Sequence, residues 1–117
     1  MTERRPNDQA LPADSERPLA GVRILAVEQY GAGPFGTMYL ADMGAEVIKI
    51  EAPAKGRAPA GDSARHSGPF FLAQGESHFF QTFNLGKKSI VLDMKQKEGR
   101  EAFHRLVATA DAVVNNL

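Results

Sequence analysis

The sequence predicts an α/β domain built on a mostly parallel sheet. Four runs rich in apolar and β-branched residues predict strands, at 22–28, 46–51, 89–93 and 112–116, and the first is typical of a strand buried on both faces. Two segments with helical periodicity, 34–43 and 95–109, lie between them. Strands that alternate with helices favour a layered fold in which helices cover a parallel sheet.

A glycine-rich turn joins the first predicted strand to the first helix. Gly31, Ala32 and Gly33 precede Pro34, whose missing N–H costs nothing in the first turn of a helix. Gly44 follows where a left-handed residue would end that helix. Together with the next strand, these segments predict a strand–helix–strand unit with a right-handed crossover.

The connection over residues 52–76 is rich in Pro and Gly and is long for a compact domain. Such connections are commonly functional or disordered. Apolar segments at 70–72 and 79–80 should nevertheless fix its later half, and we expect their aromatic side chains in the core. The third strand, the clearest helix and the fourth strand follow in that order.

Composition and charge exclude several classes of function. The 14 Lys and Arg residues equal the 14 Asp and Glu residues, so net charge gives no attraction to nucleic acid or to an acidic membrane. The absence of Cys removes disulfides, thiolate metal sites and a cysteine nucleophile, and fits a cytoplasmic protein. The three His residues lack metal-ligand spacing, so no metal site is predicted.

Residues 1–17 mix charges with two prolines and lack the apolar segment of a secretion signal, which predicts a flexible leader. No later stretch approaches the roughly 20 apolar residues that cross a bilayer. We therefore expect a soluble protein that does not bind a membrane.

Two features could bind an anion. The turn at Gly31–Pro34 leaves backbone N–H groups near a helix N-terminus, although a tight turn without a ligand fits the pattern as well. Lys87, Lys88 and Lys95 flank the third strand, and composition favours a solvated surface for them. These residues alone indicate an α/β domain and do not determine its function.

Longer blocks of sequence resemble a known family. They are PLAGVRIL at 18–25, GAGP at 31–34, LADMGAEVIKIE at 40–51 and FNLGKKSIVLDMK at 83–95. In this order and spacing they resemble the opening of class III CoA-transferases, the formyl-CoA and carnitine-CoA transferase family. The resemblance covers essentially everything from Pro18 onward.

The resemblance implies that residues 18–117 form a Rossmann-like, CoA-binding domain. This domain would be the incomplete N-terminal part of a larger two-domain fold, in an interlocked homodimer. Coenzyme A or acyl-CoA would bind as a substrate beside a carboxylic acid, with no permanently bound cofactor. The implied CoA contacts are Tyr30, Gly31, Ala32, Leu92, Asp93, Met94, Lys95, Asn116 and Leu117.

Three residues depart from the family pattern. The family often has Gln or another polar residue where Gly31 stands, formyl-CoA transferases carry Arg where Ala52 stands, and Leu117 replaces Phe. The first change affects any inference about acyl specificity, and the second removes a cation that could meet a CoA phosphate.

In the family an Asp attacks the donor thioester, and an aspartyl-CoA intermediate follows. The resemblance puts that Asp beyond Leu117. It therefore implies a truncated, inactive fragment with no catalytic residue of its own. Two alternatives stay open, an α-methylacyl-CoA racemase and a non-catalytic CoA-binding module.

Overall fold

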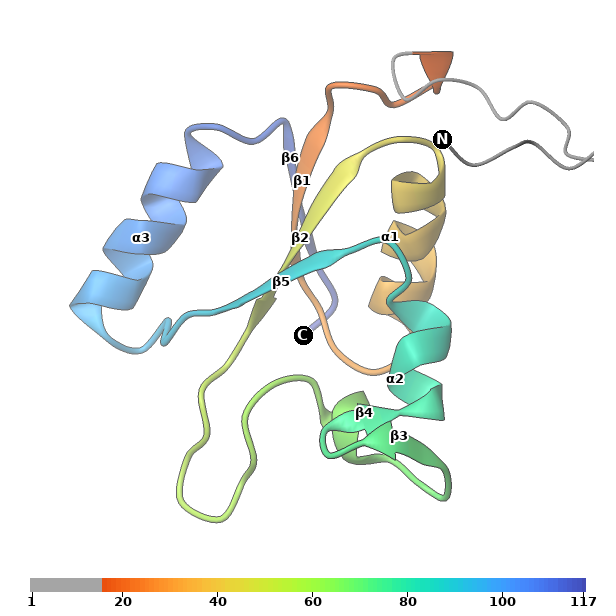
Figure 1. Ribbon diagram of the computed structural model, residues 1–117. Helices are drawn as coiled ribbons and strands as arrows, with labels where there is room; N and C mark the ends of the chain where they lie inside the picture. The colour runs from red at the N-terminus through yellow and green to blue at the C-terminus, as the bar shows by residue number, and fades with distance from the viewer. Residues whose placement is uncertain (1–15) are drawn as a thin grey trace, which may run out of the picture.

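A computed structural model describes residues 16–117 of the chain. Its main sheet has four strands in the order β5-β2-β1-β6 (Figure 1). These strands are β1 (Arg23–Val27), β2 (Glu46–Glu51), β5 (Lys88–Val91) and β6 (Ala112–Asn115). Every pairing within this sheet is parallel, which confirms the predicted α/β fold.

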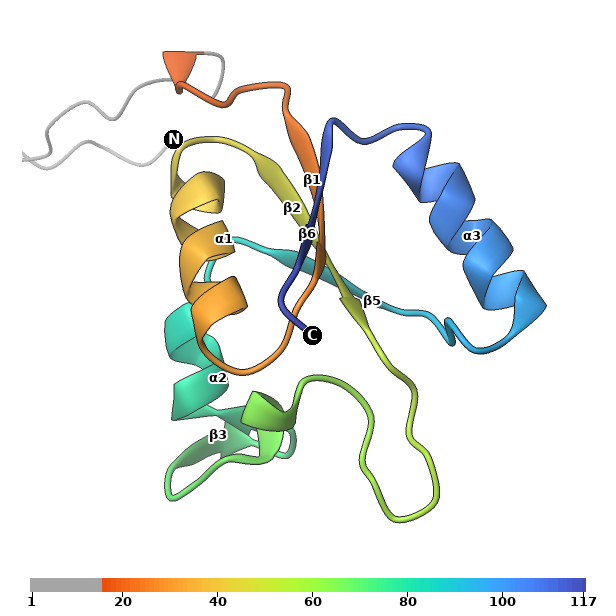
Figure 2. The ribbon, with the colours of Figure 1, turned by 180° about the vertical axis from the view of Figure 1, so that it is seen from behind.

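Helices cover both faces of this sheet. Helix α1 (Ala32–Asp42) lies on one face and α3 (Lys97–Val107) on the other (Figure 2). Successive strand residues point to opposite faces, so β1 contributes Ile24 and Ala26 to the α1 side and Leu25 to the α3 side. The central strand β1 is apolar on both faces at Ile24, Leu25 and Ala26, as expected for a strand that is covered on both faces.

The ends of both helices follow from local contacts. Gly44 ends α1 with φ +103°, and a Cβ there would lie 2.7 Å from the Cβ of Arg17. Helix α3 begins at Lys97 rather than at Lys95 because a turn comes first, in which the Gln96 N–H donates to the Asp93 carbonyl at 3.1 Å.

The connection between β2 and β5 contains regular structure that the sequence pattern did not predict. It holds a 3₁₀ turn η2 (Ser63–His66), a short hairpin of β3 (Phe71–Ala73) and β4 (Glu76–Ser77), and helix α2 (His78–Phe83). Asp62 caps the 3₁₀ turn by accepting the Ala64 N–H at 2.9 Å. Ser77 caps α2 by accepting the Phe80 N–H at 3.0 Å.

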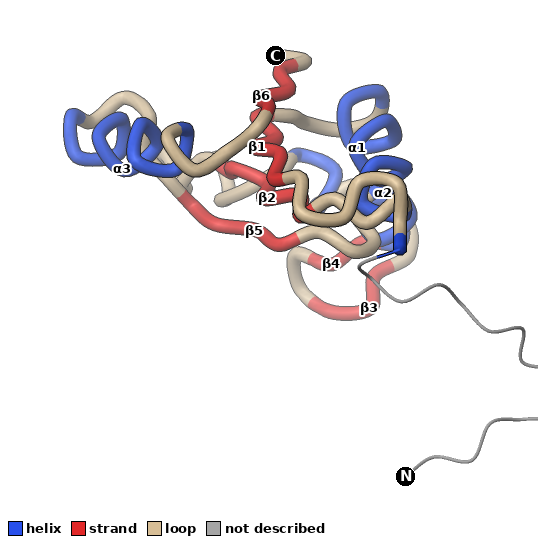
Figure 3. Tube along the Cα trace, turned by 90° about the horizontal axis from the view of Figure 1, so that it is seen from above, coloured by secondary structure: helices blue, strands red, loops and turns tan. Residues whose placement is uncertain are grey.

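The aromatic side chains at 70–72 and 79–80 were expected in the core. This expectation holds for Phe80 and is wrong for the segment at 70–72. Phe80 is 7% exposed, whereas Phe70, Phe71 and Leu72 are 66%, 48% and 66% exposed. The physical reason is that these three residues belong to the β3–β4 hairpin, which stands apart from the main sheet (Figure 3).

Residues 1–15, most of the predicted leader, lie outside the described part of the chain. Arg17 already belongs to the fold, since its carbonyl accepts the Ala20 N–H at 3.1 Å. Within residues 16–117, no helix has the length and apolar character to cross a membrane.

Candidate functional site

The order of the strands indicates where a ligand would bind. Taken in chain order, the four strands of the sheet lie third, second, first, fourth, so the direction of winding reverses between β1 and β6. In open α/β sheets ligands bind beyond the carboxyl ends of the strands at this reversal. In this chain that edge carries the β1–α1 turn and the residues that follow β2, β5 and β6.

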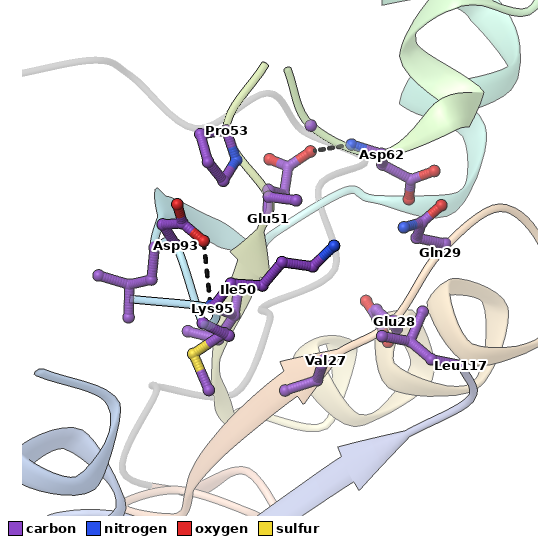
Figure 4. A pocket seen from close by; sticks show the side chains of 14 residues that line it. Val27, Glu28, Gln29, Ile50, Glu51, Pro53, Asp62, Asp93, Lys95 and Leu117 are labelled. Carbon is purple, nitrogen blue, oxygen red and sulfur yellow. Dashed lines mark hydrogen bonds between the residues drawn. The ribbon is translucent and has the colours of Figure 1, made fainter. Parts of the chain in front are cut away.

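A pocket of about 230 Å³ opens at this edge (Figure 4). Its walls come from the carboxyl end of each strand of the main sheet and from the long connection, at residues 27–29, 50–53, 61–62, 92–95 and 117. A second hollow of about 450 Å³ shares four wall residues with it, so the two are adjacent. Together they offer an extended site for a long ligand.

Five of the predicted contacts line the first pocket: Leu92, Asp93, Met94, Lys95 and Leu117. Strand β5 ends at Val91, so the next four residues turn across the pocket. The Asp93 carboxylate holds this turn by accepting the Lys95 N–H at 3.0 Å. The fold therefore brings Leu117 to the same pocket as the segment that follows β5, although they lie far apart along the chain.

The Lys95 side chain extends into this pocket (Figure 4). Its ammonium has no ion pair with any residue in 16–117. The acidic side chains Glu28, Glu51 and Asp62 also line the pocket, but each is already paired with a cation. Lys95 is therefore a positive charge available to an anionic ligand.

The predicted contacts Tyr30, Gly31 and Ala32 lie next to this pocket and do not line it. They form the turn into α1. Gly31 is the N-cap residue of this helix, and because it has no side chain, no side chain caps the helix at this position. Tyr30 adopts φ +68°, which is uncommon for a residue other than glycine. Its N–H donates to the Asp62 carboxylate at 2.9 Å.

Asn116, also predicted as a contact, uses its side chain on the protein itself. Its Oδ1 accepts the Gln29 N–H at 2.9 Å, and its Nδ2 donates to the Gln29 carbonyl at 3.1 Å. Gln29 lines both hollows, so Asn116 lies directly behind their wall.

A buried cluster of charged side chains lies next to the pocket, and sequence reasoning missed it. The Lys49 ammonium lies 2.7 Å from the Asp62 carboxylate and 3.5 Å from that of Glu28. Lys87 donates to Glu28 at 2.7 Å and to the Pro34 carbonyl at 2.9 Å. All four of these charged side chains are almost fully buried, so each depends on its partners.

The surface position expected for Lys87 is therefore wrong. Its side chain is 2% exposed, whereas that of Lys88 is 69% exposed and pairs with Glu46. Burial lowers the pKa of Lys87, and the hydrogen bond to Glu28 opposes this change. Lysine side chains are mostly exposed in folded proteins, and only the fold supplies the buried carboxylate of Glu28 that stabilises a buried Lys87.

Glu51, at the end of β2, forms a second buried pair. Arg65 donates to both of its carboxylate oxygens at 2.7 Å, and the Asp62 N–H donates at 2.7 Å. Burial raises the pKa of Glu51, but the hydrogen bonds from Arg65, Ser89 and the Asp62 backbone outweigh it and lower this pKa to about 2. Glu51 therefore stays ionised and ties the long connection to the sheet.

One sequence signal could have revealed the cluster. Lys49 sits between Ile48 and Ile50 in a run that was predicted to be a strand, and the structure shows that this strand is buried. A charged side chain in a buried strand needs an opposite charge nearby, and Glu28 ends the neighbouring apolar run.

Residues 16–117 contain no group of acidic or His side chains that could hold a metal ion.

Comparison with known proteins decides the family. Residues 19–117 match the model of a family described as CoA-transferase family III. The chain belongs to this family. The match covers the whole sheet, the pocket and the charge cluster, and it confirms the resemblance that the sequence blocks indicated.

Two relatives in family III illustrate the similarity. The succinyl-CoA:glutarate CoA-transferase of Mus musculus is 46% identical over 103 residues, which are 88% of this chain and 22% of the relative. The succinyl-CoA:mesaconate CoA-transferase of Haloarcula hispanica is 45% identical over 102 residues, 84% of this chain and 24% of the relative.

Solved structures with the same fold agree. A CAIB/BAIF family protein from Brucella suis superposes with a TM-score of 0.76 at 39% identity, covering 86% of this chain and 26% of that protein. A hypothetical protein from Mycobacterium tuberculosis gives a TM-score of 0.69 at 37% identity, covering 83% and 24%. The chain thus spans about a quarter of the length of the relatives that it matches.

Proposed function

We propose that this chain forms the CoA-contacting part of a CoA-transferase that moves CoA between carboxylic acids. The observation that carries the proposal is Lys95, a cation without a carboxylate partner among residues 16–117 that extends into the pocket at the carboxyl edge of the sheet. CoA carries phosphate groups, and a lysine donates charge-assisted hydrogen bonds to phosphate oxygens. The extended hollow suits the length of this ligand.

The remaining pocket residues have separate roles in this proposal. The apolar side chains of Leu92, Met94 and Leu117 would contact the uncharged arm of CoA. The free N–H groups near Gly31 and Ala32 would meet a polar group, since a helix N-terminus favours negative charge. Tyr30 and Asp93 would border the same ligand from the two ends of the site.

The proposed chemistry follows the family resemblance. A carboxylate of an Asp outside these 117 residues attacks the thioester carbonyl of the donor, and CoA leaves as a thiolate to give a mixed anhydride. The thiolate then attacks the aspartyl carbonyl, which releases the donor acid and forms aspartyl-CoA. The acceptor carboxylate and the thiolate repeat these two steps in reverse, and the Asp is regenerated.

Substrates and assembly are also part of the proposal. Because several relatives are named for succinyl-CoA, we propose a dicarboxylic acyl-CoA such as succinyl-CoA as the first donor to test and glutarate as the first acceptor. We also propose a cytoplasmic homodimer for the whole protein, in line with the cysteine-free sequence and the family resemblance.

Calorimetric titration of CoA into the 117-residue chain tests the site. Lys95→Ala should weaken binding by roughly ten- to a hundredfold, the usual range for one charged hydrogen bond. Gly31→Val should also weaken binding. A Cβ at Gly31 meets no atom within 4 Å apart from its chain neighbours, so the added side chain projects into open space, where it obstructs the approach of the ligand.

Lys97→Ala is the matched control, because Lys97 is a nearby lysine that is 79% exposed and lies outside the pocket. Equal affinity in the wild type and in all three variants would reject the site. So would a Lys97→Ala variant that loses as much affinity as Lys95→Ala.

A further inference from the structure

The peptide between Gln29 and Tyr30 is held from two sides by residues far away in the sequence. Asn116 makes hydrogen bonds of 2.9 Å and 3.1 Å to the N–H and the carbonyl of Gln29. Asp62 accepts the Tyr30 N–H at 2.9 Å. Both views of the ribbon show the C-terminal residues beside the β1–α1 turn (Figures 1 and 2).

This support coincides with an unfavourable backbone conformation. Tyr30 has φ +68°, a left-handed conformation that persists in residues other than glycine only when the surroundings fix it. Tyr30 is 53% exposed, and its ring packs against Phe79 with 4.7 Å between ring centroids. Gly31 is the N-cap of α1 and Ala32 is its first residue, so the conformation of Tyr30 sets the direction of their N–H groups.

Asn116 also packs against the first turn of α1. A Cβ built on Gly33 would lie 2.6 Å from the Asn116 Cγ and 2.8 Å from its Oδ1, so any larger residue at position 33 displaces this side chain. Glycine is unfavourable inside a helix relative to alanine. The space that Asn116 occupies explains why glycine is present there.

We infer that Asn116 is a positioning residue for the CoA site rather than a contact to CoA. Both ends of its amide are used by Gln29, and its role is to hold the turn at Tyr30, Gly31 and Ala32 in a shape that the ligand can meet. This inference rests on the proposed function, because it concerns the same site. It assigns to Gly33 the role of leaving room for the Asn116 amide.

A double-mutant cycle tests this coupling, with calorimetric titration of CoA into the 117-residue chain. Asn116→Ala removes the two hydrogen bonds, and Gly33→Ala pushes the Asn116 side chain away. We expect each change alone to weaken CoA binding by about five- to tenfold, as the loss of one or two hydrogen bonds would. The double variant should bind no more weakly than Asn116→Ala alone, because the added methyl group then meets no side chain.

Unfolding measurements on the same variants give a second expected result. Gly33→Ala should lower the urea midpoint in the wild-type background and raise it in the Asn116→Ala background, since alanine favours the helix once the clash is gone. A general loss of stability would give additive effects in both measurements. Additive effects would overturn the inference.

The conformation of Tyr30 is the third measurement and needs no ligand. The amide and α-carbon chemical shifts of Tyr30 and Gly31 should change in Asn116→Ala. They should stay the same in Thr109→Ala, which removes exposed hydrogen bonds distant from the pocket. Unchanged Tyr30 shifts in Asn116→Ala would overturn the positioning role.

The two proposals fail in different ways. If the wild-type chain does not bind CoA, the proposed function is rejected, and the Tyr30 shifts still decide whether Asn116 holds the turn. If CoA binds and Asn116→Ala leaves both affinity and shifts unchanged, the positioning role is rejected and the CoA site stands.

Discussion

Lys49 is the residue on which the interior of this domain most depends. Its side chain is 1% exposed and lies between the carboxylates of Glu28 and Asp62, both of which are fully buried. Apart from Lys49, no partner within residues 16–117 neutralises the Asp62 Oδ2 atom. A buried charge that loses its partner is costly because water no longer solvates it.

We expect Lys49→Met to destabilise the protein by about 3–5 kcal/mol, the range for breaking a buried ion pair. Urea unfolding with linear extrapolation measures this change. Lys97→Met is the control, since Lys97 and Glu101 lie 3.8 Å apart and are 79% and 53% exposed. That control should cost at most about 0.5 kcal/mol. A Lys49→Met variant as stable as this control would contradict the buried cluster.

Among the elements, strand β2 is the one to which side-chain contacts fix the long connection between β2 and β5. Glu51 ends this strand and receives hydrogen bonds from Arg65 and the Asp62 backbone, while the Arg65 guanidinium lies 3.9 Å from the centroid of the Phe80 ring. These contacts join η2 and α2 to the carboxyl end of the sheet. They place Asp62 where it can accept the Tyr30 N–H.

The pKa of Glu51 gives this element a predictable dependence on pH. Its pKa is lowered from 4.5 to about 2 in the folded protein. The stabilisation is therefore fully present above pH 4.5 and is lost as the pH falls from there toward 2. The shift corresponds to about 3 kcal/mol at neutral pH, as an order of magnitude.

Urea unfolding between pH 6 and pH 2 checks this prediction. The wild type should lose more stability across that interval than Glu51→Gln, which has no carboxylate at this position to protonate. Glu101→Gln, with its exposed side chain on α3, should follow the wild-type curve. Parallel curves for the wild type and Glu51→Gln would show that Glu51 has an ordinary pKa.

At the scale of the whole molecule, ion pairs within the pocket bear on the proposal that the nucleophile is not one of its buried acids. The pocket acids Glu28, Glu51 and Asp62 are all held by cations. A carboxylate that is fixed in a buried ion pair is a poor nucleophile, because attack would leave its cation without a partner. Asp93 is the remaining acid among the described residues that line the pocket.

We therefore expect the purified 117-residue chain to form no glutaryl-CoA from succinyl-CoA and glutarate, with a full-length relative as the positive control. Chromatographic separation of the CoA esters measures the product. Product formation by the wild type that disappears in Asp93→Asn would contradict this prediction and would make Asp93 the nucleophile.

Local patterns along the sequence were sufficient for the elements and the family. Strand and helix periodicity repeat within a few residues, so the four parallel strands and both covering helices could be predicted, with shifts of at most two residues at their ends. The β3–β4 hairpin and α2 were missed, because short elements depend on caps such as Ser77 more than on periodicity.

Contacts between distant residues depended on the tertiary structure. Lys87 meets Glu28 across 59 positions, and Asn116 meets Gln29 across 87, so neither partner leaves a periodic pattern near the other. The sequence by itself determined the α/β architecture and the family, and the family resemblance pointed to the segment from Leu92 to Lys95 that lines the pocket. Only the tertiary structure decided that Lys87 is buried and that Asn116 faces the backbone, because the free energy of a charged or amide group depends on the partner that folding brings to it.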